Sequence, residues 1–242
     1  DIIMVYIITA LVLLLVIVAI SIYEYDKNSK IEKLPARPAA KGRNDGFSKI
    51  MNSNVHEILF KIENNIQLKK DDYESIEDAC IYIDQRYDCL DFRMQTLIRL
   101  LYKYSDKIPS KYKDMIKKAL LGSKYFMDQP GEDSICFWSE NHLLLFATAE
   151  YLTGQLYEDE IFTNDGLTGS RHKEIALERI NIWLEQRFNY GFTEWFSNTY
   201  YEEDIAPLAN LIDFCDDSGV VEKSKMIMDL LLFDIAAQSY KG

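Results

Sequence analysis

The stretch Phe137-Trp138-Ser139-Glu140-Asn141-His142 stands directly before an apolar run at helical spacing over residues 143–156. A second stretch of similar composition, Gly191-Phe192-Thr193-Glu194-Trp195-Phe196-Ser197-Asn198-Thr199-Tyr200-Tyr201, precedes another such run at 205–214. Outward from these two stretches the same spacing recurs, and no sustained alternation with period two indicates a sheet. The sequence therefore predicts an all-α fold after about residue 47, with further helical runs at 50–66, 76–83, 97–104, 116–120, 175–188 and 220–240.

The order of the last four runs suggests a topology. Helical hairpins can close around an axis into an α/α toroid, in which inner and outer helices alternate and the inner helices run parallel. With 143–156 and 205–214 as inner helices and 175–188 and 220–240 as outer ones, the two aromatic stretches lie at the same end of a partial toroid. The loop over 157–172 then lies at the opposite end.

The chain divides into three parts. Residues 2–23 carry no charge and are long enough to span a bilayer, so 1–23 is predicted to be one transmembrane anchor with the lipid bilayer as its partner. Ile20-Ser21-Ile22-Tyr23 is a poor cleavage site, which argues against a signal peptide. Residues 24–46 form a tether that contains prolines and lysines, and 47–242 form the helical domain. We expect residues to be missing before Asp1 and after Gly242.

Two arguments about orientation conflict. The basic residues of the tether follow the apolar run, which on the positive-inside rule favours a cytoplasmic domain. A glycan-processing domain would more naturally face outward, so we expect a single-pass membrane protein with an extracytoplasmic domain.

Composition excludes several classes of function. With 48% hydrophobic residues the 242-residue chain is expected to be folded over most of its length, and its net charge of −12 gives no general attraction for nucleic acid. There is no Gly-x-Ser-x-Gly elbow and no phosphate-binding Gly-rich loop with a lysine, and no cofactor is predicted. The four cysteines form no CxxC pair, so no metal site is predicted. We expect most of them to be buried free thiols, with a disulfide between Cys80 and Cys89 as the alternative in an exported chain.

The two aromatic stretches suit a sugar ring, which has apolar faces and a hydroxylated rim. His142 lies in the first turn of its helix, where the helix dipole is expected to lower its pKa and keep the imidazole neutral as a base. Tyr200 or Tyr201 is the matching acid or base. The candidate catalytic residues are His142, Tyr201, Tyr200, Asn141 and Glu140, and the candidate substrate-binding residues are Trp138, Glu194, Trp195 and Asn198.

From residue 137 onward the chain resembles a family of mostly uncharacterised bacterial proteins with a helical toroid. The resemblance is carried by Trp138-Ser139-Glu140-Asn141-His142, Asn164-Asp165-Gly166-Leu167-Thr168-Gly169, Gly191-Phe192-Thr193-Glu194-Trp195 and Ser197-Asn198-Thr199-Tyr200-Tyr201. More distantly, the arrangement is similar to the toroid domains of polysaccharide lyases. That similarity implies β-elimination on a polysaccharide or oligosaccharide, with Asn141 or Asn198 neutralising a uronate, His142 as base and Tyr200 or Tyr201 as acid. Lyases also use an arginine in the cleft, and neither stretch supplies one.

Other interpretations stay open. Glycoside hydrolysis needs two carboxyl groups, and an acidic cleft favours a neutral glycan over a polyuronate. A third possibility is a protein that binds glycans, or acts as a scaffold, without chemistry. Trp138 can instead be a hydrophobic staple, Asn141 and His142 can cap and pack the helix, and the acidic loop near 158–165 can bind Ca²⁺. The carboxylates available for hydrolysis are Glu140, Glu194, Glu202 and Asp204.

Overall fold

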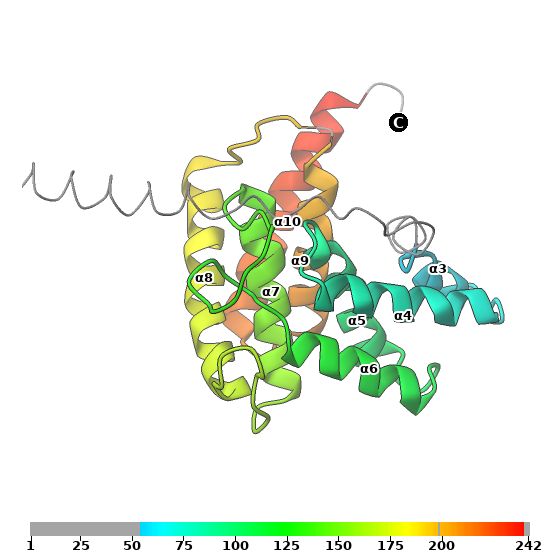
Figure 1. Cartoon of the computed structure of the whole chain (residues 1–242). Coiled ribbons are helices and arrows are strands. Elements are labelled where there is room, and N and C mark those ends of the chain that lie inside the picture. Colours follow the sequence, from blue (N-terminus) through cyan, green and yellow to red (C-terminus); the bar gives the residue numbers. More distant parts are fainter. Residues whose placement is uncertain (1–53, 198, 240–242) are drawn as a thin grey trace, which may run out of the picture. The chain divides into compact units, whose positions relative to one another are not determined.

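The computed structural model of the chain describes residues 54–197 and 199–239 (Figure 1). These residues are all helical apart from their connecting loops and a single isolated bridge between Ile161 and Thr168, which confirms the all-α prediction. The helices are α3 (Glu57–Glu63), α4 (Lys70–Asp84), α5 (Leu90–Lys103), α6 (Ser110–Leu121), α7 (Glu140–Leu156), α8 (Gly169–Tyr190), α9 (Tyr201–Phe214) and α10 (Ser218–Gln238).

The predicted anchor at 1–23 and the tether at 24–46 lie outside the described residues. Within the described part of the chain, no helix is both long enough and apolar enough to cross a membrane. The chain separates into two units, residues 1–45 and residues 46–242, and every described residue belongs to the second unit.

Side-chain caps fix where three of the long helices begin. The hydroxyl of Ser139 accepts a hydrogen bond from the backbone N–H of His142 and starts α7. Thr168 accepts in the same way from Arg171 at the start of α8, and Asp217 accepts from Val220 at the start of α10. These caps lie before the first apolar residue of each run, so each helix begins two to six residues earlier than the apolar spacing alone predicts.

Helix α7 lies at the centre of the domain, where it packs against α5, α8 and α9. The four helices α7 to α10 lie roughly side by side in Figure 1, and α8 and α9 both contact α10 as well. Helices α4 and α6 pack together and lie crosswise to that group. A single apolar core of buried side chains runs from Val55 near α3 to Leu231 in α10.

A buried polar network joins α5, α7 and α9. The Gln95 side-chain amide donates to the carbonyl of Leu145 at 2.8 Å. The Asn210 amide donates to the Gln95 side-chain oxygen at 2.9 Å, and Arg99 donates to Asn210 at 2.9 Å. Because each buried amide has a partner, the network fixes the relative register of the three helices rather than destabilising the core.

Candidate functional site

The loop before α7 and the loop before α9 meet at Glu140, the first residue of α7. Its carboxylate oxygen Oε2 accepts a hydrogen bond from the backbone N–H of Thr193 at 2.6 Å. The same oxygen forms an ion pair with Arg187, and the Trp183 indole donates to the Glu140 carbonyl at 2.7 Å. The two stretches singled out in the sequence therefore lie in contact at one end of the helical domain.

Several carboxyl groups surround this contact. Asp204 in α9 is buried, and burial together with the charges of Glu140 and Glu194 raises its pKa to about 8. Glu194 is half-buried, and its pKa is also raised, first by burial and then by the charge of Glu140. At neutral pH the cluster therefore contains a carboxyl group that holds its proton next to an ion-paired carboxylate, which is the arrangement that acid–base catalysis needs.

The same cluster contains buried polar atoms without a hydrogen-bond partner in the described part of the protein. They are Glu140 Oε1, Arg187 Nε and Asp204 Oδ1. Leaving a buried polar atom unpaired costs free energy, and a catalytic role, a bound water or a bound ion can each account for such an atom. This acidic cluster, defined as Glu140, Arg187, Glu194 and Asp204, is our candidate site.

His142 has the opposite charge state from the one predicted. Its Nδ1 lies 2.5 Å from Oδ2 of Asp91, a fully buried residue of α5. Burial alone would lower the pKa of His142, but hydrogen bonds with Asp91 and Cys89 outweigh burial and raise the pKa to about 10. The predicted neutral imidazole is wrong, because a facing carboxylate has a stronger effect than the helix dipole.

Asn141 contacts α9. Its side-chain amide donates to Oε2 of Glu203 at 2.7 Å. Glu203 is half-buried, and burial raises its pKa above the usual range for a glutamate. Asn141 therefore links the start of α7 to Glu203, the residue before Asp204 in α9.

Tyr201 and Tyr200 behave differently, although they are adjacent. Tyr201 is buried as the first residue of α9, and its hydroxyl accepts from the backbone N–H of Phe196 at 2.9 Å and donates to Asp234 at 3.3 Å. Burial is the largest effect on its hydroxyl and raises the pKa. Tyr200 is exposed. Asn198, the remaining candidate, lies outside the described residues.

The two tryptophans next to the cluster point largely into solvent. Trp138 is 70% exposed and Trp195 is 73% exposed, and the ring of Trp195 stacks on Phe196 with centroids 4.6 Å apart. Such exposure excludes the role of a hydrophobic staple for Trp138, since a staple packs against the helix. Exposed indoles on either side of a polar cluster are available to stack on a ligand.

Three charged residues in or beside the site were not identified from the sequence. Asp91 comes from α5, Arg187 from the last turn of α8, and Glu203 from the first turn of α9. Arg187 supplies the arginine that neither aromatic stretch contains. Asp91 and Arg187 lie 51 and 47 residues from the partners they contact, so no local motif marks them.

The acidic loop before α8 uses its carboxylates within the protein. Glu158 pairs with Lys173 at 2.9 Å, and Asp165 lies 3.1 Å from His172. His172 also contacts the buried Glu150 at 2.7 Å, in accord with a structural role for this histidine. Among the described residues, this loop contains no group of His, Cys, Asp or Glu close enough to hold a metal ion.

The cysteines are all free thiols, so the alternative disulfide between Cys80 and Cys89 is not formed. Cys80 alone is buried, whereas the other three are half-buried, which corrects the expectation that most are buried. Their positions in the fold explain this difference in burial. Cys80 faces the core from the middle of α4. Cys89 and Cys215 lie at helix ends, where the chain reaches the surface, and Cys136 lies in the loop before α7.

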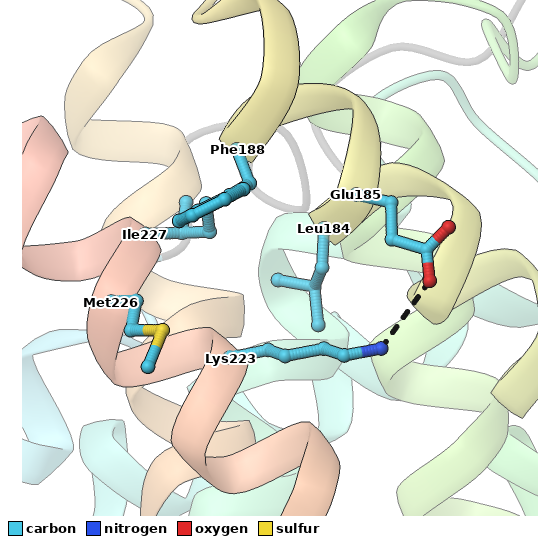
Figure 2. A pocket seen from close by; sticks show the side chains of 6 residues that line it. All are labelled: Leu184, Glu185, Phe188, Lys223, Met226 and Ile227. Carbon is cyan, nitrogen blue, oxygen red and sulfur yellow. Dashed lines mark hydrogen bonds and ion pairs between the residues drawn. The ribbon is translucent and has the colours of Figure 1, made fainter.

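Two hollows in the described structure are lined by residues outside the acidic cluster. An apolar groove between α8 and α10 is lined by Leu184, Phe188, Met226 and Ile227, and Lys223 crosses it toward Glu185 (Figure 2). Its two charged lining residues, Lys223 and Glu185, are paired with each other at 3.4 Å. A second groove lies beside Tyr201 and is lined by Ser197, Tyr201, Glu202, Ile235, Gln238 and Ser239.

Comparisons of the chain with known protein families, with curated proteins and with solved structures found no match.

Proposed function

We propose that the acidic cluster binds a glycan and cleaves it by acid–base chemistry of carboxyl groups, which makes the protein a glycoside hydrolase. The observation that carries the proposal is the buried set of Glu140, Arg187 and Asp204, each with an unpartnered polar atom in the described part of the chain. Two exposed tryptophans, Trp138 and Trp195, lie close in sequence to Glu140 and Glu194. Sugar-binding sites combine aromatic faces for stacking with a few fixed polar groups, and this region offers both.

Hydrolysis of a glycosidic bond needs one carboxylic acid that protonates the leaving oxygen and one carboxylate that activates water or attacks the sugar. Glu194 suits the first role, because it is half-buried and its raised pKa favours the protonated form. Glu140 suits the second role, because Arg187 and the backbone N–H of Thr193 stabilise its charge while Oε1 keeps no partner in the described residues. Asp204 holds its own proton at neutral pH and therefore adds no negative charge beside Glu140.

Two observations favour hydrolysis over the β-elimination that the resemblance to lyases implies. His142, the expected base, is paired with Asp91 and holds its proton at neutral pH. Tyr201, the expected acid, already donates its hydroxyl to Asp234, and burial raises its pKa. Proton exchange by these two groups at neutral pH would require both to leave their partners.

The proposal includes the architecture and the setting of the domain. Helices α5, α7 and α9 contact one another, while α8 packs on α7 and α10 packs on both α8 and α9. This alternation supports an arc of an α/α toroid with α7 and α9 on the inner side. We also propose that residues 2–23 anchor the chain in a membrane and that the helical domain is extracytoplasmic.

Product masses test the reaction. The full chain is incubated with a panel of neutral and uronate-containing oligosaccharides, and the products are analysed by mass spectrometry. Hydrolysis gives two fragments whose masses sum to the substrate plus one water, whereas β-elimination gives fragments that sum to the substrate and an unsaturated sugar that absorbs ultraviolet light. We expect the first result with neutral glycans. The second result would contradict the proposal in favour of a lyase.

Matched variants test the residues. Glu194→Gln should lower kcat by at least about a hundredfold with an unchanged melting temperature, since general acid catalysis typically contributes that much. Glu222→Gln, an exposed carboxylate of α10 paired with Lys225, should keep full activity. If Glu194→Gln behaves like Glu222→Gln, Glu194 is not the acid. If the wild-type chain binds glycans without cleaving any, the protein is a binding module.

Trp195 tests binding separately from cleavage. Trp195→Ala should weaken glycan binding roughly tenfold, the equivalent of about 1.4 kcal/mol, because a stacking face is lost. Phe60→Ala on α3 removes an aromatic ring that is 62% exposed and lies outside the two loops, so it should leave the dissociation constant unchanged. Both dissociation constants are measured by isothermal titration with the oligosaccharide that is cleaved best. Each variant also carries Glu194→Gln, which prevents turnover during the titration.

A further inference from the structure

Beside the acidic cluster lies a second group of side chains with different chemistry. The ligating atoms of Asp88, Cys89 and His142 all lie within 4.8 Å of one another, and no other such group of three occurs among the described residues. Asp88 and Cys89 lie in the turn between α4 and α5, and His142 lies in the first turn of α7. Asp88 is exposed, Cys89 is half-buried and His142 is buried, so the group is open to solvent on one side.

The surrounding structure holds each of these side chains in place. Cys89 adopts a left-handed backbone conformation with φ 62°, which is unfavourable for a residue with a Cβ and persists only when its surroundings impose it. The Asp88 carboxylate accepts a hydrogen bond from the backbone N–H of Cys136 at 2.8 Å, and its carbonyl accepts from the Tyr82 hydroxyl at 2.6 Å. The strained turn therefore has a defined orientation.

His142 is oriented by a buried carboxylate. Nδ1 lies 2.5 Å from Asp91, which leaves Nε2 as the nitrogen that can bind a metal ion. The rings of Phe92 and Phe146 flank the imidazole at centroid distances of 5.5 and 6.4 Å. Histidines that bind metals commonly use one nitrogen for the metal while the other contacts a carboxylate, which fixes the ring.

We propose that Asp88, Cys89 and His142 form a binding site for Zn²⁺ or a similar first-row transition-metal ion. The ligands are the Cys89 thiolate, Nε2 of His142 and one carboxylate oxygen of Asp88, and Asp91 is a positioning residue for His142. Metal binding releases the Cys89 thiol proton and the Nε2 proton of His142 to water, while Nδ1 keeps its proton for Asp91. A thiolate and an imidazole select such ions over Mg²⁺ and Ca²⁺, which prefer oxygen ligands. Three protein ligands leave the fourth tetrahedral position for water or a substrate oxygen, as in catalytic zinc sites.

The absence of a CxxC pair does not argue against this site, because its ligands come from two parts of the chain. Asp88 and Cys89 are adjacent, and His142 follows more than fifty residues later at the start of another helix. The site does not depend on glycan cleavage, and metal binding can be measured without any glycan. If no glycan is hydrolysed, the metal-site proposal therefore still stands. If no metal binds, the proposed hydrolysis likewise still stands.

Cobalt substitution provides a direct test. The full chain is freed of metal with a chelator under reducing conditions and titrated with Co²⁺, whose absorption reports thiolate ligation and tetrahedral geometry. We expect one equivalent to bind with a thiolate-to-cobalt charge-transfer band, and stoichiometric Zn²⁺ to remove that band. Absence of a saturable band in the wild-type protein would overturn the proposal.

Variants assign the ligands. Cys89→Ser should abolish the charge-transfer band, and His142→Ala should weaken Co²⁺ binding at least a hundredfold. Asp91→Asn should weaken it by about ten- to a hundredfold while keeping the band, because a group that orients a ligand tunes affinity without binding the metal. Cys215→Ser, which removes another half-buried thiol at the end of α9, should leave the spectrum unchanged. Equal binding by Cys89→Ser and the wild-type protein would refute the assignment.

Thiol alkylation of the wild-type protein keeps the test decisive if a variant does not fold. Zn²⁺ should slow the reaction of iodoacetamide with Cys89 at least tenfold, as read by peptide mass spectrometry, and should leave the rate at Cys215 unchanged. If Cys89 reacts faster than Cys215 and Zn²⁺ gives no protection, the metal site is ruled out. Cys89 and His142 would then be a nucleophile and its base, with Asp91 behind the histidine.

Discussion

At the scale of single residues, a few buried charges distinguish this site from ordinary helix packing. Glu140, Asp91 and Asp204 are all buried carboxyl groups, and each lies at or near the beginning of a helix. Glu140 faces Arg187 and Asp91 faces His142, whereas no cation makes an ion pair with Asp204 in the described structure. Burying an uncompensated carboxylate is costly, so Asp204 retains its proton instead.

The protonation of Asp204 predicts how stability changes with pH. Its pKa rises from 3.8 in the unfolded chain to about 8 in the folded state, so between these values the folded state holds a proton that the unfolded state releases. Stability from this group is therefore lost as pH rises from about 4 to about 8, by roughly 1.4 kcal/mol per pH unit at most. Asp204→Asn removes that loss, and the variant should gain stability relative to the wild-type protein as pH increases.

Urea unfolding of both proteins across this pH range measures the difference directly. Glu194 and Glu203 also have raised pKa values, but they are present in both proteins and largely cancel in the comparison. A stability difference that is constant with pH, or that shrinks as pH rises, would show that Asp204 ionises normally in the folded state.

At the scale of the elements, the close packing of α7 and α8 depends on a glycine. A Cβ placed on Gly154 would lie 2.5 Å from the carbonyl oxygen of Gly169 and 2.9 Å from the backbone nitrogen of Lys173. Both contacts are with backbone, which cannot rotate away. Gly154 therefore sets how near the end of α7 approaches the start of α8. The acidic loop connects these two helices, at the opposite end of α7 from Glu140.

Gly154→Ala should lower the free energy of unfolding by about 1–3 kcal/mol, the usual cost of overpacking, although alanine is the better helix former. Gly219→Ala in the first turn of α10 is the matched control, since its Cβ would meet only the Asp217 carboxylate at 3.2 Å. That change should be neutral or stabilise by up to about 1 kcal/mol. Equal melting temperatures for the two variants would show that α7 and α8 can separate freely.

The helices could be predicted from the sequence, and so could the start of α7 from His142 in its first turn, but apolar spacing places the starts of α8, α9 and α10 too late. Apolar spacing identifies α7, but α9 begins with Tyr201 and then Glu202, Glu203 and Asp204, which give no apolar signal. The contact between Glu140 and Thr193 follows the expected meeting of the two aromatic stretches. The charge of His142 could not be predicted, because Asp91 reaches it from another helix and only the folded chain brings them together.

At the scale of the whole molecule, the described helical domain has its own core. The buried apolar side chains of the described residues form one cluster, which joins helices from α3 to α10. The boundary between the two units of the chain falls between Asp45 and Gly46, within the sequence that we interpret as the end of a tether. A domain with its own core is expected to fold without such a segment.

We therefore predict that a chain beginning at Asn44 folds in water without detergent, whereas the full chain associates with membranes. The physical reason is that residues 2–23 form an uncharged run that is long enough to span a bilayer, and the shortened chain lacks this run. Flotation with neutral lipid vesicles separates the two proteins, and circular dichroism with a cooperative thermal transition reports folding of the shortened one. Neutral lipids remove the attraction between the tether's lysines and anionic headgroups, so flotation then measures the apolar run alone. If the shortened chain loses its cooperative transition, residues 2–23 belong to the core of the fold, and the anchor interpretation must be abandoned.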